Sequence, residues 1–195
     1  MKRMIRASSL NYTPLYHGTT LTNAIKILES NELRANISNE TETYGLSTTR
    51  NKLEAYDSVA FVLNKDKLQT QFKVKPVYRE GIAGLDLAEE RIDRTVKPLN
   101  KYCEQIMWND TSKSNIKLRV LRRKLVENFD NEQYTSDSAT DAYKIKKIGQ
   151  LADRLGIPLD GRFEEALNWI AKFEARVFDA ERYNEVQARR KRGSN

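Results

Sequence analysis

The hydrophobic positions divide the chain into two halves with different periodicities. From Leu15 to about Trp108, short apolar runs alternate with polar turn residues around one early helix, a pattern typical of short strands. From about Thr111 onward, apolar residues recur mainly at helical spacing. The pattern predicts an α+β domain over residues 1–108, followed by a helical C-terminal region over residues 109–195.

The same pattern predicts the individual elements. In the first half, Thr20 or Thr22 caps a helix that ends near Asn31. Strands are expected at Leu15–Tyr16, Gly45–Thr48, Val59–Leu63, Phe72–Val77, Ile82–Leu87 and Tyr102–Met107. In the second half, helices are expected around Ile116–Leu125, over Ala142–Leu155, and from Gly161 or Phe163 to Ala188, with a polar loop or mobile segment over residues 128–143.

Composition removes several classes of protein. Within the 195 residues, no run approaches the roughly 20 apolar residues of a membrane-spanning helix. The charged start is not followed by the apolar stretch of a signal peptide, so we expect a cytoplasmic protein. The single cysteine, Cys103, and the single histidine, His17, exclude disulfide frameworks and Cys/His zinc sites. No metal site is predicted, and any metal would have to bind carboxylates.

The net charge of +7 is concentrated at the two ends of the chain. Residues 1–28 carry +4, from Lys2, Arg3, Arg6 and Lys26, and the run Arg189–Arg192 carries another +4, whereas residues 29–188 sum to −1. A basic terminal run is either a solvated tail or an electrostatic tether to nucleic acid or to an acidic partner. The nearly neutral middle argues against a protein that binds nucleic acid over its whole surface.

The segment LYHGTTLTNAIKILESNEL holds the most informative chemistry. His17 lies at the end of a short apolar run, Gly18 allows a ligand to approach the backbone, and Thr19 and Thr20 begin a helix with free N–H groups. This arrangement suits a polar ligand. A lone surface histidine before a capped helix is the simpler interpretation of these residues taken alone.

The order of motifs along the chain favours a ligand site over a lone surface histidine. The chain contains YHGTT, then AIKIL and NELRA, then GLSTTRN with Tyr56 after it, and finally AEERI. This order resembles that of ADP-ribosyltransferases of the His-Tyr-Glu branch, which includes diphtheria toxin and the poly-ADP-ribose polymerases, and also that of short transferase-like proteins of bacteriophages. The resemblance covers residues 14–108. It implies a split β-sheet domain that binds NAD as a substrate.

The resemblance also implies roles for individual residues. His17 would hydrogen-bond a ribose of NAD, and the Gly18 backbone would hold the nicotinamide carboxamide, with Thr19 and Thr48 beside them. Ser47 occupies the position of a tyrosine or serine in the family strand. Tyr56 would stack on the nicotinamide ring, or pack in the core beside Val59 and Phe61.

The last block must supply a carboxylate, because breaking the nicotinamide–ribose bond develops positive charge on the ribose. Glu89 and Glu90 are the candidates. Strand alternation sends their side chains to opposite faces, so one of them can point into the cleft, and the register favours Glu89. Leu87 stands two residues before Glu89, where arginine-directed and Rho-directed relatives have Glu or Gln, so modification of arginine is disfavoured.

Three functions remain open from the sequence. The first is an ADP-ribosyltransferase that modifies a protein or nucleic acid, as a phage effector would in the cytoplasm of its host. The second is an NAD glycohydrolase, which uses water as acceptor at the same site. The third is a non-catalytic module of the same fold that binds nucleic acid or a host protein through its basic ends.

Overall fold

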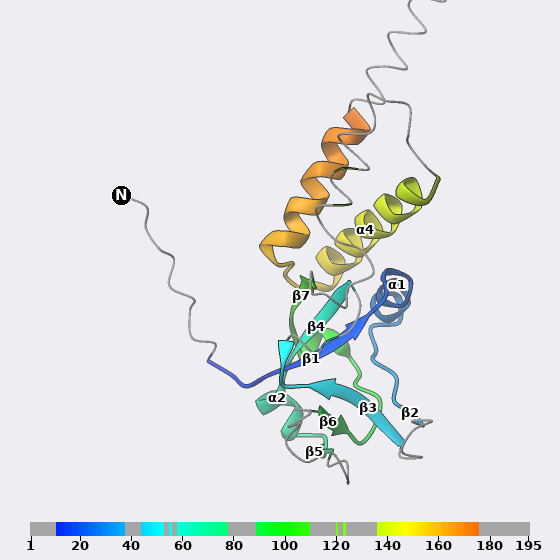
Figure 1. The fold of residues 1–195 in the computed structure, drawn as a ribbon. Helices are drawn as coiled ribbons and strands as arrows, with labels where there is room; N and C mark the ends of the chain where they lie inside the picture. Colours follow the sequence, from blue (N-terminus) through cyan, green and yellow to red (C-terminus); the bar gives the residue numbers. More distant parts are fainter. Residues whose placement is uncertain are drawn as a thin grey trace, which may run out of the picture.

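The computed structural model describes residues 11–37, 44–52, 55, 58–77, 89–109, 120, 123 and 136–175 of the chain (Figure 1). Its fold is α+β, as the sequence predicts. The elements follow one another as β1 (Pro14–Thr19), α1 (Leu21–Ser30), β2 (Asn36–Ile37), β3 (Tyr44–Thr49), β4 (Val59–Asn64), α2 (Lys65–Gln69), β5 (Val74–Pro76), β6 (Glu89–Ile92), the 3-10 turn η2 (Leu99–Lys101), β7 (Cys103–Trp108) and α4 (Ser136–Leu155), with a further helix over 161–175.

The described strands form one antiparallel sheet in the order β5-β6-β3-β1-β4-β7, with β2 paired to β3. Strands β1 and β4 pair along their whole length, from Pro14 and Asn64 to Thr19 and Val59. In contrast, the register of the described residues joins β1 and β3 at the single pair Tyr16–Thr49. The sheet is therefore continuous on the β4 side of β1, and β1 and β3 are held together over a much shorter length.

Strand β4 lies between β1 and β7 in the sheet and is buried at every position. Val59, Phe61 and Leu63 belong to the main core, which α1, α4 and the helix over 161–175 cover, as Figure 1 shows. Ala60 and Val62 face the other side, in a small cluster with Met107. A nearly continuous apolar run of this kind is typical of a strand that is buried on both faces.

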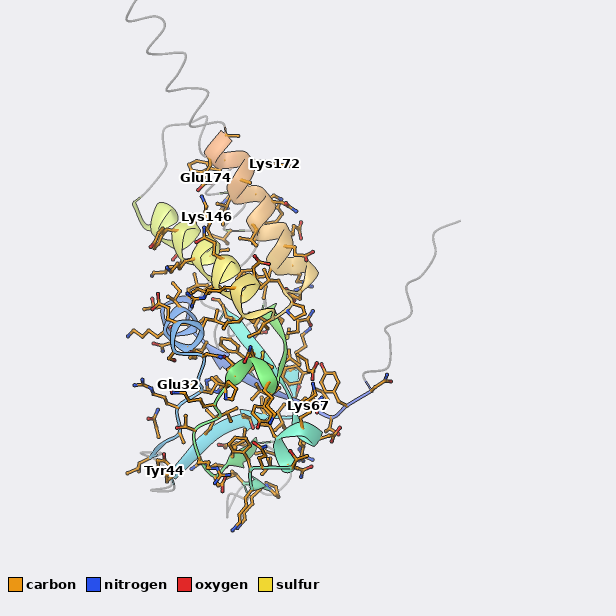
Figure 2. The ribbon with its side chains drawn as sticks, turned by 180° about the vertical axis from the view of Figure 1, so that it is seen from behind. Glu32, Tyr44, Lys67, Lys146, Lys172 and Glu174 are labelled. Carbon is orange, nitrogen blue, oxygen red and sulfur yellow. The ribbon has the colours of Figure 1, made fainter. Side chains whose placement is uncertain are left out.

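The helical half shares its core with the sheet. Ile145, Ile148 and Phe163 are fully buried in the same cluster as Phe61 and Trp108, and the Phe163 ring packs edge-on against Trp108 with 5.7 Å between ring centroids. At the exposed surface of the helical half, the Lys146 amino group lies 2.8 Å from both Glu174 carboxylate oxygens. This ion pair joins α4 to the helix over 161–175 (Figure 2). The boundary near residue 108 separates two patterns of secondary structure, but the core crosses it.

Asp160 fixes the second long helix to the sheet. Its Oδ1 accepts from the Phe163 N–H at 2.8 Å, as a helix cap does, and from the Trp108 N–H at 3.1 Å. Leu159 makes an isolated parallel bridge to Ile106. One side chain therefore determines both where this helix begins and where it lies against β7.

Several predicted boundaries change in the structure. The expected strand Phe72–Val77 is shortened to Val74–Pro76, because the Phe72 N–H bonds back to Leu68 at the end of α2, a helix that the sequence analysis did not predict. Helix α4 begins at Ser136, inside the expected loop over 128–143, since serine and aspartate suit the start of a helix. The expected strand Ile82–Leu87, the helix Ile116–Leu125 and the helix end at Ala188 lie outside the described residues.

Candidate functional site

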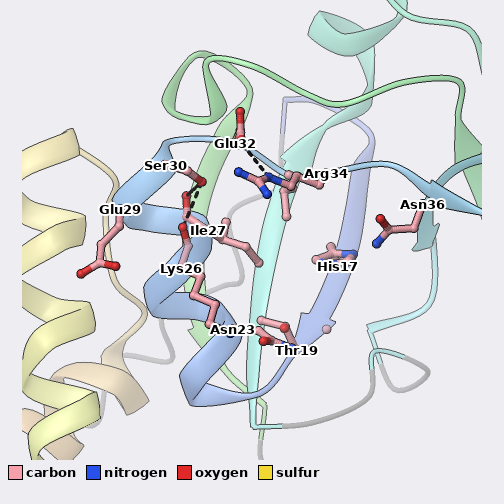
Figure 3. Close-up of a pocket in the computed structure, with 12 residues that line it drawn as sticks. His17, Thr19, Asn23, Lys26, Ile27, Glu29, Ser30, Glu32, Arg34 and Asn36 are labelled. Atoms are coloured by element: carbon pink, nitrogen blue, oxygen red, sulfur yellow. Dashed lines mark hydrogen bonds and ion pairs between the residues drawn. The ribbon is translucent and has the colours of Figure 1, made fainter.

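The site begins where β1 runs into α1. The end of β1 carries His17, Gly18 and Thr19, and Thr20 caps α1 by accepting a hydrogen bond from the Asn23 N–H at 3.2 Å. The helix ends at Asn31, whose left-handed backbone (φ 52°) turns the chain back toward the sheet. Both predicted helix ends are confirmed. The return segment, which includes Arg34 and Asn36, then passes in front of His17 (Figure 3).

This turn encloses a cavity of about 880 Å³. The volume lies within the range of about 300–1,000 Å³ that is typical of small-molecule sites. His17, Gly18 and Thr19 form one wall, one face of α1 forms a second, and the segment from Glu32 to Asn36 forms the third (Figure 3). His17, Gly18 and Thr19 therefore line one cavity of a size that suits a small molecule.

A hydrogen bond determines which nitrogen of His17 can meet a ligand. Nδ1 lies 3.0 Å from the backbone oxygen of Ser47. A carbonyl oxygen only accepts, so Nδ1 carries the proton, and in the neutral ring Nε2 is the acceptor. Burial lowers the pKa of His17 below its ordinary value, against a smaller opposite effect of the Ser47 bond. His17 is therefore neutral at pH 7 and accepts a hydrogen bond, for example from a hydroxyl.

The lowered pKa of His17 predicts a pH effect on stability. The unfolded chain takes up a proton at His17 below about pH 6.5, whereas the folded protein does so only at lower pH. Stability is therefore complete above pH 6.5 and decreases as the pH falls from 6.5 toward the folded-state pKa. Melting temperatures measured between pH 7.5 and 5 should fall in the native protein, and should fall less in His17→Gln; equal falls would contradict the assignment.

The charges around the cavity are unevenly compensated. Glu32 is held by Arg34 at 2.6 Å and by Lys97 at 3.3 Å, and hydrogen bonds from both lower the pKa of its carboxyl group. Glu29 has Lys147 at 3.8 Å. Within the described part of the chain, Lys26 has no ion-pair partner. Among the described residues that line the cavity, Lys26 is thus the cation without an acidic partner, and its charge favours an anionic ligand beside α1.

Ser47 connects the histidine to one of the two candidate carboxylates. Its backbone oxygen accepts from His17, and its hydroxyl donates to Glu89 Oε1 at 2.8 Å. Glu89 Oε1 also lies 3.3 Å from Nη2 of Arg91. These contacts bring together the segments YHGTT, GLSTTRN and AEERI. Neither Ser47 nor Glu89 lines the cavity itself.

Glu90 occupies the other face of β6. Its side chain is 2% exposed, and Oε1 lies 2.7 Å from the Lys65 amino group and 3.3 Å from Nε of Arg50. Thr48 is also buried, and its hydroxyl donates to the backbone oxygen of Glu90 at 2.8 Å. Two of the predicted site residues thus have bonds inside the sheet. Thr48 does not line the cavity, so its expected contact with a ligand stays a prediction.

Other predicted and unpredicted residues complete the description. Tyr56, the basic residues Lys2, Arg3 and Arg6, and the run Arg189–Arg192 lie outside the described residues. Sequence analysis did not assign cavity roles to Asn23, Ile27, Ser30, Arg34 and Asn36, which line it. Three of them, Asn23, Ile27 and Ser30, are spaced four and three residues apart on α1 and therefore share one face of the helix. The sequence could have indicated this wall from that spacing.

Cys103 has no place in this chemistry. It is buried in the core, and burial raises the pKa of its thiol to about 12. A thiol in this state is not a nucleophile at neutral pH.

Searches with this chain found no matching family model, no matching curated protein and no matching solved structure. Among the described helices, none combines the length and the apolar character needed to cross a bilayer. In the same part of the chain, no three His, Cys, Asp or Glu residues are grouped as a metal site.

Proposed function

We propose that this protein is an ADP-ribosyltransferase that binds NAD beside His17 and transfers its ADP-ribose to a macromolecular acceptor, either a protein or a nucleic acid. The observation that carries the proposal is the double use of Ser47, which binds the His17 ring through its backbone and the Glu89 carboxylate through its hydroxyl. A histidine that accepts from a hydroxyl, joined to a carboxylate, suits a reaction at a ribose.

The residues at the cavity fit this substrate. Nε2 of His17 can accept from a ribose hydroxyl. Gly18 has no side chain between its backbone and the cavity, so an amide such as the nicotinamide carboxamide can pair with it. Lys26 supplies positive charge for a pyrophosphate. Tyr56 keeps its proposed role as the aromatic partner of the nicotinamide ring.

The proposed reaction exchanges one bond at the ribose C1′. The bond from C1′ to the nicotinamide nitrogen breaks, and its electron pair leaves with nicotinamide. The acceptor forms a new bond to C1′ and loses a proton to solvent. Positive charge grows on the ribose in the transition state, and in this proposal the Glu89 carboxylate stabilises that charge through the ribose 2′-hydroxyl.

Binding of NAD should stabilise the folded protein. A ligand that binds only the folded state raises the free energy of unfolding by RT ln(1 + [L]/Kd). We expect NAD to raise the melting temperature, and we expect a smaller rise in His17→Ala because a hydroxyl partner is lost. Asn168→Ala, at an exposed site on the helix over 161–175, is the control. Equal shifts in the His17 variant and the native protein would place the ligand elsewhere.

One experiment tests the reaction and its acceptor. The protein is incubated with NAD labelled in the adenosine part and with a cell extract, and the label is then followed. Label in protein or in nucleic acid supports transfer and identifies the acceptor class. Label released as free ADP-ribose, with or without extract, identifies a glycohydrolase instead. Unchanged NAD rejects both enzymes and favours a binding module. A phage effector that modifies a host macromolecule in the cytoplasm is the setting that fits the first outcome.

A further inference from the structure

Arg91 lies two residues after Glu89 on β6, and its side chain therefore leaves the same face of the strand. Its Nη2 is 3.3 Å from Glu89 Oε1. The two side chains are only 11% and 15% exposed, respectively, so this pair is shielded from solvent more than a surface ion pair is. Exposed ion pairs contribute little to stability, whereas a lower dielectric strengthens a shielded pair.

Two donors meet on one oxygen of the carboxylate. Glu89 Oε1 receives the Ser47 hydroxyl at 2.8 Å and Arg91 Nη2 at 3.3 Å. A single donor would leave the carboxylate free to rotate about its last bond. Two donors that approach from different strands define the plane of the carboxylate and thus the direction of Oε2.

Gly45 makes room for the Arg91 side chain. A Cβ at this position would lie 2.5 Å from Cγ and 2.7 Å from Cδ of Arg91, and 2.9 Å from the backbone oxygen of Ile92. Distances below 3.0 Å are not tolerated by real Cβ atoms, and the last of them involves backbone that cannot move aside. The φ angle of +154° adds to the requirement for glycine. The stem of Arg91 thus lies directly against Gly45, in the space that a Cβ would fill.

We propose that Arg91 is a positioning residue for the cleavage of NAD, and that it acts by fixing the Glu89 carboxylate together with Ser47. The inference rests on the proposed function. Arg91 touches Glu89 and is not assigned a contact with NAD. Removal of its charge should therefore change the rate of the chemical step more than the binding of the substrate, because a displacement of about 1 Å in a catalytic group can cost on the order of a hundredfold in rate.

The kinetic test compares Arg91→Met, Arg91→Lys and Arg94→Met. Arg94 is a matched control, since it lies three residues further along, binds the backbone oxygen of Gln71 and stacks 5.1 Å from the Phe72 ring centroid. We expect Arg91→Met to lower kcat for nicotinamide release by about 10- to 100-fold with KM for NAD changed less than about threefold. Arg91→Lys should recover part of kcat, and Arg94→Met should resemble the native protein. A kcat within twofold of native in Arg91→Met would overturn the inference.

Gly45→Ala tests the geometry from the other strand. The added methyl group must displace the Arg91 stem and also the backbone oxygen of Ile92, so this variant should lose at least as much kcat as Arg91→Met. Combining the two substitutions should lower kcat little further, since both remove the same contact. Independent, multiplying losses would show that Gly45 acts without Arg91 and would overturn this part of the inference.

A measurement without NAD separates the pair from the reaction. Unfolding free energies of Glu89→Gln, Arg91→Met and the double variant form a cycle in which coupled residues are non-additive. We expect the double variant to lose less stability than the two single losses added together; additive losses would overturn the inference. If the cycle shows coupling but the native protein releases no nicotinamide, the pair is real, and the proposed function is rejected together with the positioning role of Arg91.

Discussion

Glu89→Gln is expected to reduce nicotinamide release by at least about a hundredfold while NAD still raises the melting temperature as in the native protein. Glutamine keeps the size of the side chain and an oxygen that can accept from Ser47 Oγ. It lacks the negative charge that opposes the positive charge of the transition state, and loss of one such electrostatic partner costs on the order of 10²–10³ in rate. Nicotinamide release at saturating NAD, together with a thermal shift by NAD, measures both effects.

Glu90→Gln is the matched control for this prediction. It makes the same chemical change one residue later, on the opposite face of β6, where the side chain is buried against Lys65 and Arg50. We expect this variant to be less stable, because two cations lose a charged partner, but to retain most of its kcat at temperatures where it is folded. If Glu90→Gln abolishes the reaction and Glu89→Gln does not, the catalytic role belongs to Glu90.

The elements that sequence predicts well are those whose signal is local. The capping Thr20 and the left-handed Asn31 bound α1 as expected, and the apolar runs of β4 and β7 are found in place. Each of these signals occupies a few neighbouring residues, so no knowledge of the rest of the fold is needed. The separation of Glu89 and Glu90 onto opposite faces also follows from local strand geometry alone.

The features that sequence misses depend on contacts between distant segments. Ser47 and Glu89 are 42 residues apart, and nothing in either segment states that β3 pairs with β6 in this register. The third wall of the cavity comes from the segment after α1, whose direction depends on the bridge between Leu33 and Val96. The five-residue helix α2 lacks the length for a periodic signal, although Asn64 caps it at 3.0 Å from the Lys67 N–H.

The structure also changes the meaning of the basic charge. The excess of +4 in residues 1–28 includes one residue that the structure describes at the cavity, Lys26. The acids that share the cavity, Glu29 and Glu32, each have a cation of their own. Positive charge from Lys26 is thus available where an anionic ligand would lie, as the proposed function requires.

The second large effect is expected from Phe163→Ala, which should lower the free energy of unfolding by about 3–5 kcal/mol. The Phe163 ring is fully buried and packs edge-on against Trp108, so its removal leaves a cavity between the helical half and β7. Domains of this size are stable by about 5–15 kcal/mol, so the loss is a large fraction of the total. Chemical denaturation, followed by far-ultraviolet circular dichroism and by tryptophan fluorescence, measures it.

The two signals distinguish one folding unit from two. Because the core residues of α4 and the helix over 161–175 belong to the same cluster as β4 and β7, the halves on either side of residue 108 should unfold together. Circular dichroism reports mainly the helices. Fluorescence reports β7 through Trp108 when it is measured in a Trp169→Phe background, because Trp169 lies on the helix over 161–175. Both curves should shift by the same amount. Tyr143→Ala, at a side chain 66% exposed on α4, should shift neither curve by more than about 0.5 kcal/mol. Separate transitions in Phe163→Ala would show that the sheet is stable without its helical cover, and the proposed NAD site could then be studied on residues 1–108 alone.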